Sequence, residues 1–273
     1  MSNLNCFILS FHIRLIGAGS AGRKIMIKYH GLPITPASSA YAAINKRHAF
    51  VSFAHPDQLG IAVECCQSFA IDNGAFTAWK SGKTPDWDEF FDWAEEISYL
   101  PSCDFIVIPD VIDGELNDQT RLIARFLQRF GSRGLSVGAP VFHIHEPLEH
   151  AAYLSRAWDR VCIGSSGEYA EIGTPKWWNR MNQVMTAMCD KQGRPNCKIH
   201  GLRMLDPDVF TRFPFASADS TNIGRNIGID QKWKGTYSPA SKDVRAIVMA
   251  DRIEQRNSTD RWDSQPVQME LVA

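Results

Sequence analysis

Phe213-Pro-Phe-Ala-Ser-Ala-Asp219-Ser-Thr-Asn222 is the stretch of this chain that decides the fold. A short apolar run leads to one carboxylate and then breaks into small polar residues. Such a run predicts a buried strand with Asp219 at its carboxyl end. A single Asp in this position is often only the cap of the next helix. Several other apolar runs end in the same way, and this repetition indicates a repeated strand-and-loop architecture.

Short apolar runs bounded by Gly, Pro or polar residues recur along the chain, as expected of buried parallel strands. Eight of them lie at Ile25–Tyr29, Phe50–Ala54, Ser68–Ile71, Asp104–Ile108, Pro140–Ile144, Arg160–Ile163, Lys198–Met204 and Phe213–Ala218. Helical spacing separates most of these runs, most clearly at Trp87–Ile97, which begins behind the capping signal Thr84-Pro-Asp86. The alternation predicts an α/β fold, a single (β/α)8 barrel of the TIM type. A doubly wound open sheet is the alternative.

Other segments with helical spacing complete this pattern. They lie at Pro36–Ile44, Asp57–Cys65, Leu122–Phe130, Leu148–Trp158, Trp177–Met188 and Val244–Arg256. With 273 residues, 44% of them hydrophobic, the chain can bury one large core. We expect an N-terminal extension at residues 1–25, a catalytic barrel at 26–256 and a polar tail at 257–273 that has no fixed structure.

Composition limits the class of protein. The formal net charge is −1, so nucleic-acid binding requires a local basic patch. The seven Cys have no CxxC pairs, which indicates reduced thiols in a cytoplasmic protein, of the host cell if a phage encodes it. The apolar run near the N-terminus is too short to span a bilayer, and no membrane partner is expected.

Gly17-Ala-Gly-Ser-Ala-Gly22 formally matches the glycine pattern of dinucleotide-binding sites. That motif requires an acidic residue roughly 20 positions further on to hold the ribose. No Asp or Glu lies between Gly22 and Asp57. We therefore assign the glycines to the N-terminal extension and expect no cofactor.

Ionisable and small polar residues follow almost every predicted strand. They are His30-Gly31, His55, Asp72-Asn-Gly-Ala-Phe76, Pro109-Asp110, His143-Ile-His145-Glu146, Ser165-Ser-Gly-Glu168, His200-Gly201 and Asp219-Ser220. In a barrel these ends converge on one mouth, where active sites are built. Three Asp and several His are too many to be helix caps alone, so we expect an enzyme. The residues expected around one cavity are Asp72, Asp110, His145, His200 and Asp219.

Two chemistries suit this set of residues. In the first, one carboxylate attacks an anomeric carbon and another serves as general acid and base. In the second, the residues bind a metal ion that activates water, as in a metal-dependent hydrolase of a small molecule. His143 and His145 lie two apart on a predicted strand and share a face, so with Asp219 they are the candidate ligands. A non-catalytic nucleic-acid-binding barrel is a third possibility, but it leaves the strand-end Asp residues unexplained.

Asp72-Asn-Gly-Ala-Phe76 resembles the Asp-Ser-Gly-Gly-Phe segment of the tRNA-guanine transglycosylases, barrel enzymes that exchange guanine for a 7-deazaguanine. Phe215-Ala-Ser-Ala-Asp-Ser-Thr221 is more similar to the phage and bacterial DNA transglycosylases known as DpdA. The resemblance spans roughly residues 29–226, in short motifs in matching order. It implies a pentosyltransferase without a cofactor, in which Asp219 is the nucleophile and Asp72 the general acid and base.

The same resemblance implies a base-binding pocket in which Asp110 reads the Watson–Crick edge. The substrate-binding residues that we expect are Asn73, Phe76, Asp110, His143, His145, Glu146, Gly164, Ser165, Ser166 and His200. Phe76 and Tyr169 are the candidates to stack on the base. A free 7-deazaguanine is the second substrate that the resemblance implies.

Two departures from the family bear on the nucleic acid. The tRNA enzymes carry a structural zinc site of three close Cys and a His after the last strand, and no Cys follows Cys197 here. The extra segments usual in the family are also nearly absent. Both departures favour DNA over tRNA as the partner, and we expect no structural zinc site.

Basic and aromatic residues alternate after the last predicted strand, within the Gly-rich stretch Asn222–Pro239. This composition is typical of a loop that binds a nucleic-acid strand, although an ordinary solvated loop has it too. The candidates for contacts to nucleic acid are Arg225, Lys232, Trp233 and Lys234.

Overall fold

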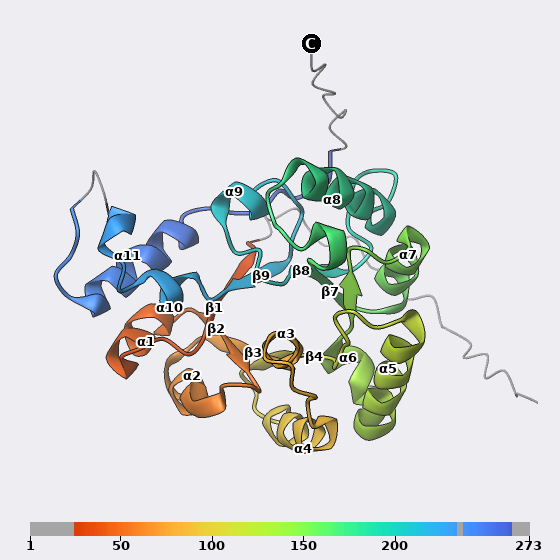
Figure 1. The fold of residues 1–273 in the computed structure, drawn as a ribbon, viewed down its shortest axis with the longest axis horizontal. Coiled ribbons are helices and arrows are strands. Elements are labelled where there is room, and N and C mark those ends of the chain that lie inside the picture. The colour runs from red at the N-terminus through yellow and green to blue at the C-terminus, as the bar shows by residue number, and fades with distance from the viewer. Residues whose placement is uncertain (1–24, 234–236, 264–273) are drawn as a thin grey trace, which may run out of the picture.

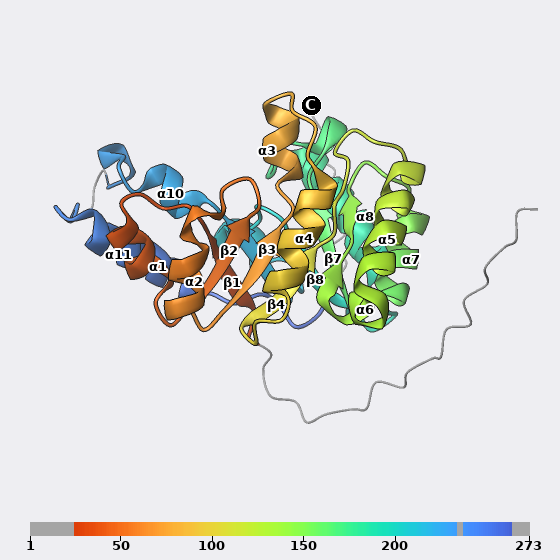
Figure 2. The ribbon, with the colours of Figure 1, turned by 90° about the horizontal axis from the view of Figure 1, so that it is seen from below.

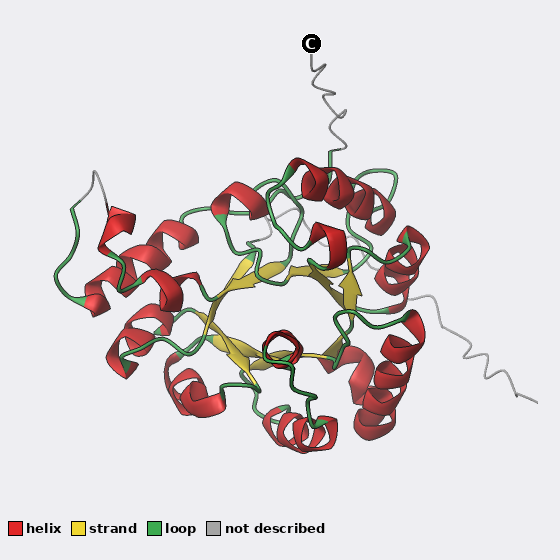
Figure 3. Cartoon of the chain, in the orientation of Figure 1, coloured by secondary structure: helices red, strands yellow, loops and turns green. Residues whose placement is uncertain are grey.

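A ring of parallel strands surrounded by helices forms the body of the molecule (Figure 1, Figure 3). The computed structural model describes residues 25–233 and 237–263, without the side chains of Gln231 and Lys232. The strands are β1 (Ile27–Gly31), β2 (His48–Ser52), β3 (Ser68–Asp72), β4 (Cys103–Val107), β5 (Gly138–Ala139), β6 (Val141–His143), β7 (Arg160–Gly164), β8 (Lys198–Gly201) and β9 (Ser217–Ser220). Their order in the sheet is β5-β4-β3-β2-β1-β9-β8-β7-β6, and every pair is parallel.

Pro140 joins the two ends of this sheet. It separates β5, which pairs with β4, from β6, which pairs with β7. Proline has no N–H to give to a ladder, so the strand is interrupted there. Its carbonyl still accepts a hydrogen bond from the Cys162 N–H at 2.9 Å. β5 and β6 therefore together occupy the place of one strand, and the nine segments form an eight-stranded barrel. The expected (β/α)8 barrel is confirmed.

Helices lie on the outside of the ring in most strand-to-strand connections (Figure 3). They are α1 (Ala37–Ile44), α2 (Leu59–Cys65), α3 (Ala75–Lys80), α4 (Trp87–Ile97), α5 (Leu116–Phe130), α6 (Gly134–Val137), α7 (Leu148–Ala157), α8 (Pro175–Met188), α9 (Pro207–Phe210), α10 (Asn222–Asn226) and α11 (Lys242–Glu254). Short 3-10 turns lie at η1 (Pro56–Gln58), η2 (Gly131–Arg133), η3 (Gly167–Tyr169) and η4 (Asp230–Trp233). Within the described part of the chain, no helix has the length and apolarity needed to cross a membrane.

The starts of α4 and α5 follow from local chemistry. The Asp86 side chain accepts hydrogen bonds from the N–H groups of Asp88 and Glu89, so α4 begins where the sequence predicts. In α5 a reciprocal capping box between Glu115 and Asp118 starts the helix six residues before the expected Leu122. The acidic residues in both first turns also complement the helix dipole.

The largest displacements of expected strand boundaries are in β1, β2, β8 and β9. β1 and β2 are shifted by two residues relative to the expected runs, toward the C-terminus in β1 and toward the N-terminus in β2. β8 ends at Gly201 and not at Met204, because Arg203 adopts a left-handed backbone with φ of 59° and turns the chain. The Phe213–Ala216 part of the last expected run precedes β9 and packs its aromatic side chains into the core.

Large apolar side chains fill the barrel interior below the mouth. Tyr29, Phe50, Phe105, Val141 and Cys162 belong to this inner cluster. The larger core lies between the strands and the surrounding helices. The interior is therefore packed, and the space for a ligand is at the carboxyl ends of the strands, as in barrels of this kind.

Residues 257–263 pack against the opposite end of the barrel from the mouth, although we expected them to belong to a loose polar tail. Trp262 is buried and stacks on Phe213, with ring centroids 5.8 Å apart. The backbone N–H of Trp262 donates to the Gly193 carbonyl at 2.7 Å. Only glycine fits at position 193, because a Cβ there would lie 2.1 Å from the backbone oxygen of Trp262. The rest of the expected tail, 264–273, and the expected extension up to residue 24 lie outside the described residues.

Candidate active site

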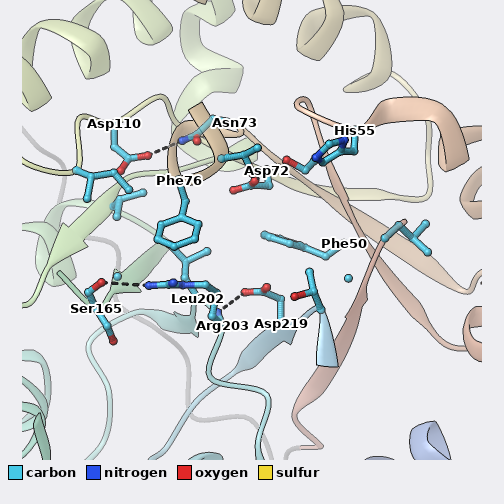
Figure 4. A pocket seen from close by; sticks show the side chains of 18 of the residues that line it. Phe50, His55, Asp72, Asn73, Phe76, Asp110, Ser165, Leu202, Arg203 and Asp219 are labelled. Carbon is cyan, nitrogen blue, oxygen red and sulfur yellow. Dashed lines mark hydrogen bonds between the residues drawn. The ribbon is translucent and has the colours of Figure 1, made fainter. Parts of the chain in front are cut away.

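A cavity of 390 Å³ opens at the carboxyl ends of the strands (Figure 4). Its wall combines three carboxylates, two imidazoles, two guanidinium groups and apolar side chains. The residues that line it are Gly31, Leu32, Pro33, Phe50, Ser52, His55, Asp72, Asn73, Phe76, Thr77, Asp110, Ile112, Val141, His143, Gly164, Ser165, Leu202, Arg203, Asp219, Thr221, Gly224 and Arg225. The three Asp expected at the mouth thus face one space, although 147 positions of sequence separate Asp72 from Asp219.

Asp219 stands near the carboxyl end of β9 and is 4% exposed. Its Oδ1 accepts a hydrogen bond from the Arg203 backbone N–H at 2.8 Å and lies 3.3 Å from Nε2 of His200. Both contacts are to the same oxygen, and Oδ2 has no hydrogen bond within the described part of the chain. Asp219 is therefore a carboxylate with one oxygen fixed and the other available to a ligand.

Asp72 ends β3 and is held differently. Its Oδ2 accepts from the Ser52 hydroxyl at 2.9 Å and from the Gly74 N–H at 3.1 Å. Burial and the nearby charge of Asp219 raise the pKa of Asp72 to about 7, against the opposing effect of the Ser52 hydrogen bond. A carboxyl group with this pKa can both give and take a proton near neutral pH.

Asp110, Asn73 and His143 form one wall of the cavity. The Asn73 amide donates to Oδ1 of Asp110 at 2.7 Å and to the Ile108 carbonyl at 2.8 Å, so its orientation is fixed. Nε2 of His143 lies 2.9 Å from Oδ2 of Asp110, so the two form an ion pair when the ring is protonated. Burial acts to lower the pKa of His143, but Asp110 outweighs it and the net shift is upward. Nδ1 of His143 has no partner among the described residues.

Arg203 is the main residue of the cavity that the sequence analysis did not identify. Its guanidinium lies over the Phe76 ring, 3.9 Å from the centroid, and its Nη2 donates to the Ser165 carbonyl at 3.2 Å (Figure 4). Phe76 belongs to α3, which projects beyond neighbouring helices at one end of the barrel (Figure 2). The stack of Arg203 on Phe76 thus brings a cation close to Asp219. The sequence signal was a basic residue two positions after the expected His200-Gly201 strand end.

Five residues expected in the site do not line the cavity: His145, Glu146, Ser166, Tyr169 and His200. β6 ends at His143, so His145 lies in the following turn, where it is exposed and bonds Ser166 through Nδ1 at 2.7 Å. The same turn directs Glu146 toward His150 of α7, 2.9 Å away. His200 is fully buried beneath Asp219. Tyr169, expected to stack on a base, also lies outside the cavity, near Lys176 and Arg180.

The alternative of a metal-dependent hydrolase requires His143, His145 and Asp219 to converge. The two His rings stack on each other with centroids 5.8 Å apart, but only His143 faces the cavity. In the described residues, no group of three or more His, Cys, Asp and Glu is arranged to hold a metal ion. The expected ligand set is therefore not assembled, because the strand that would align the two His ends too early.

The segment expected to be a nucleic-acid-binding loop is partly helical, with α10 and η4. Arg225 in α10 is exposed and lines the cavity. Trp233 is 3% exposed, with the Arg252 guanidinium 5.0 Å from its ring centroid, so it does not offer a face to a ligand. The Lys232 side chain and Lys234 lie outside the described residues.

Comparison with known proteins finds similarity in fold only. No family model matches the sequence, and no curated protein is similar to it. Similar solved structures include tryptophan synthase from M. tuberculosis in its open form with BRD0059 bound, with 9% identity, 85% of this chain and 92% of that chain covered, and a TM-score of 0.46. A protein of Aquifex aeolicus VF5 has 10% identity, coverage of 87% and 94%, and a TM-score of 0.47. Likeness at this level says nothing about the reaction.

Proposed function

We propose that this protein is a base-exchange glycosyltransferase that replaces guanine in nucleic acid with a 7-deazaguanine. The observation that carries the proposal is a pair of carboxyl groups in one cavity with different environments. Asp219 has one oxygen fixed by hydrogen bonds and the other open to the cavity. Asp72 has its pKa raised to about 7. These environments suit Asp219 as the nucleophile and Asp72 as the general acid and base.

The reaction divides into two displacements at the anomeric carbon. Oδ2 of Asp219 forms a bond to that carbon as the bond to the guanine nitrogen breaks, and Asp72 gives its proton to the departing base. The product is an ester between Asp219 and the sugar. The incoming base then attacks the same carbon, loses its ring N–H proton to Asp72, and releases the Asp219 carboxylate. Two displacements retain the configuration of the sugar, as in retaining glycosidases.

The remaining wall residues suit a planar, polar base. Phe50, Leu202 and Val141 supply apolar surface, and Asp110 with Nδ1 of His143 supplies hydrogen-bonding atoms at one side. A cavity of 390 Å³ is within the range of small-ligand pockets. A base in a duplex cannot reach a carboxylate at this depth, so the nucleotide is flipped out or supplied in a single strand.

DNA is the nucleic acid that we propose, with a free 7-deazaguanine base as the second substrate. The chain lacks Cys after Cys197 and with them the zinc site of the tRNA enzymes. Arg225 on the rim and Arg203 inside the cavity are cations suited to a phosphate near the reacting sugar. The protein needs no cofactor in this reaction, since both displacements use its own carboxyl groups.

The test is incorporation of labelled guanine or a labelled 7-deazaguanine into DNA and, separately, into tRNA. We expect incorporation into DNA and a covalent protein–DNA adduct on denaturing gels. Asp219→Asn should abolish the adduct and lower the rate on the order of 10³-fold or more, as when a nucleophile is removed. Asp72→Asn should lower the rate about 10²- to 10⁴-fold through lost proton transfer.

Asp57→Asn is the matched control, because Asp57 is an exposed carboxyl outside the cavity and its loss should leave the rate unchanged. Incorporation into tRNA alone would contradict the choice of DNA. Exchange by Asp219→Asn at the wild-type rate would show that Asp219 is structural and that the mechanism is wrong.

A further inference from the structure

A chain of polar groups lies beneath Asp219 in the otherwise apolar barrel interior. His200 of β8 places Nε2 3.3 Å from Oδ1 of Asp219 and Nδ1 2.9 Å from the Ser217 hydroxyl. The Arg160 guanidinium of β7 donates to the same hydroxyl at 2.9 Å and lies over the Phe105 ring. Neither His200 nor Ser217 has any exposed surface, and neither lines the cavity.

The order of donors along this chain follows from the chemistry of its ends. A guanidinium has no acceptor, so the Ser217 oxygen accepts from Arg160. The hydroxyl keeps one proton, which it can donate to Nδ1 of His200. The carboxylate of Asp219 only accepts, so a neutral His200 that bonds it carries its proton on Nε2 and accepts at Nδ1. The Asp219 end of the chain therefore selects this tautomer, and the Arg160 end is compatible with it.

The surroundings of His200 favour the neutral ring. Tyr29, Phe50 and Phe105 pack against it, with ring centroids 5.2 to 5.9 Å away. Burial lowers the pKa of His200, Asp219 opposes this effect, and the charge of Arg160 adds to it, for a net shift downward. Asp219 and Arg160 are the charged groups that act on the ring. Asp219 consequently receives a hydrogen bond from a neutral donor at this oxygen, and His200 forms no ion pair with it.

We propose that Arg160, Ser217 and His200 are positioning residues that hold His200 as the neutral Nε2–H tautomer and thereby fix Oδ1 of Asp219, with Oδ2 presented to the substrate. The value of this arrangement for catalysis rests on the proposed base exchange. A carboxylate whose rotation is blocked at one oxygen keeps the other aligned with the anomeric carbon, and small errors in such alignment are costly. An imidazolium in the same place would pair with the carboxylate and weaken it as a nucleophile.

The direct test needs no substrate. Nitrogen-15 NMR of the protein labelled at histidine should show His200 neutral from pH 6 to 8, with Nε2 protonated and Nδ1 unprotonated. In Ser217→Ala the Nδ1 resonance should move toward that of a nitrogen without a hydrogen bond. A protonated Nδ1 in the wild type, or an unchanged Nδ1 resonance in Ser217→Ala, would overturn the proposal.

The second test compares two substitutions of His200 in the exchange reaction. Gln retains an N–H that can reach Asp219, whereas Leu does not. We expect His200→Leu to lower the rate about 10- to 100-fold, the effect of one hydrogen bond to a charged group, and His200→Gln to restore most of it. Equal losses in the two variants would contradict a positioning role.

Cys162→Ala is the control for packing, because Cys162 pairs with His200 in the sheet and is buried. Its rate should stay near that of the wild type. If the wild-type protein exchanges no base at all, the proposed function fails, and the NMR experiment still decides the arrangement of the three residues.

Discussion

At Asp72, burial, the charge of Asp219 and the hydroxyl of Ser52 act on one carboxyl group. The first two raise its pKa and the third lowers it, with a result of about 7. Asp219 lies in the same cavity, but hydrogen bonds from the Arg203 N–H and His200 act on its charged form. Two residues of one type thus have different environments, and such a difference allows a carboxyl pair to divide between nucleophile and acid.

The stability of the protein should report the raised pKa of Asp72. The folded state binds more protons than the unfolded chain between about pH 4 and pH 7, so the free energy of unfolding falls as the pH rises through this window. Asp72→Asn removes this titration and keeps an oxygen for Ser52. We expect the variant to exceed the wild type in stability by on the order of 2–4 kcal/mol at pH 8, and by less at pH 5.

Urea unfolding of both proteins at the two pH values measures this difference, with Asp57→Asn as the exposed control. A gain in stability that is the same at pH 5 and pH 8 would mean that Asp72 does not titrate in this range.

The residues of the cavity were only partly predictable from the sequence. Asp72, Asp110 and Asp219 follow their strands directly, and strand ends converge in any parallel barrel. Arg203 was not predicted as a cavity residue because its position depends on its left-handed backbone conformation. This conformation is uncommon for a residue other than Gly, and the sequence gives no sign of it. His145 was placed wrongly because the alternation of side chains holds only while the strand continues, and β6 stops at His143.

At the scale of elements, each expected strand has a counterpart, and the errors lie at the boundaries. Pro140 was expected to begin a strand, but it joins two short strands that pair with different neighbours. An apolar run shows which residues are buried, but it does not show where the hydrogen bonds of a strand begin. Phe213 and Phe215 were therefore assigned to a strand, although they are buried core residues that precede it. α4 was predicted to the residue because its capping signal is local and chemical.

That cap gives a prediction for α4. Asp86→Ala removes the acceptor for two N–H groups at the helix start and should lower the free energy of unfolding by about 1 kcal/mol. Asp92→Ala on the same helix is the matched control, since Asp92 makes only a surface ion pair with Arg129, and its loss should cost about 0.5 kcal/mol or less. Chemical denaturation of the two variants compares them; equal losses would mean that the cap contributes nothing beyond surface charge.

At the scale of the whole molecule, the cavity lies at the carboxyl ends of the strands, with three carboxylates facing one space. An aromatic cluster packs along α8, and in it Phe213 contacts Trp177, Trp178 and Trp262. Trp177 lies in the first turn of α8 and donates to the Ser165 hydroxyl in the cavity wall, whereas the Trp262 indole donates to Thr186 in the last turn of the same helix. The segment 257–263 therefore joins the cluster at the end of α8 that is farther from the cavity.

Trp262→Ala should therefore reduce stability without changing the cavity. The substitution removes a buried ring that stacks on Phe213 and donates to Thr186 at 3.2 Å, and it should lower the free energy of unfolding by about 3 kcal/mol. Tyr153→Ala is the control, because Tyr153 is an aromatic residue 59% exposed on α7 and its loss should change stability by about 0.5 kcal/mol or less. Denaturant unfolding at constant pH measures both. In folded Trp262→Ala the stability gained by adding Asp72→Asn at pH 8 should equal that in the wild-type background, since distant sites are additive. A smaller gain would show that the loss of the Trp262 ring reaches the cavity through the aromatic cluster, and the prediction would be wrong.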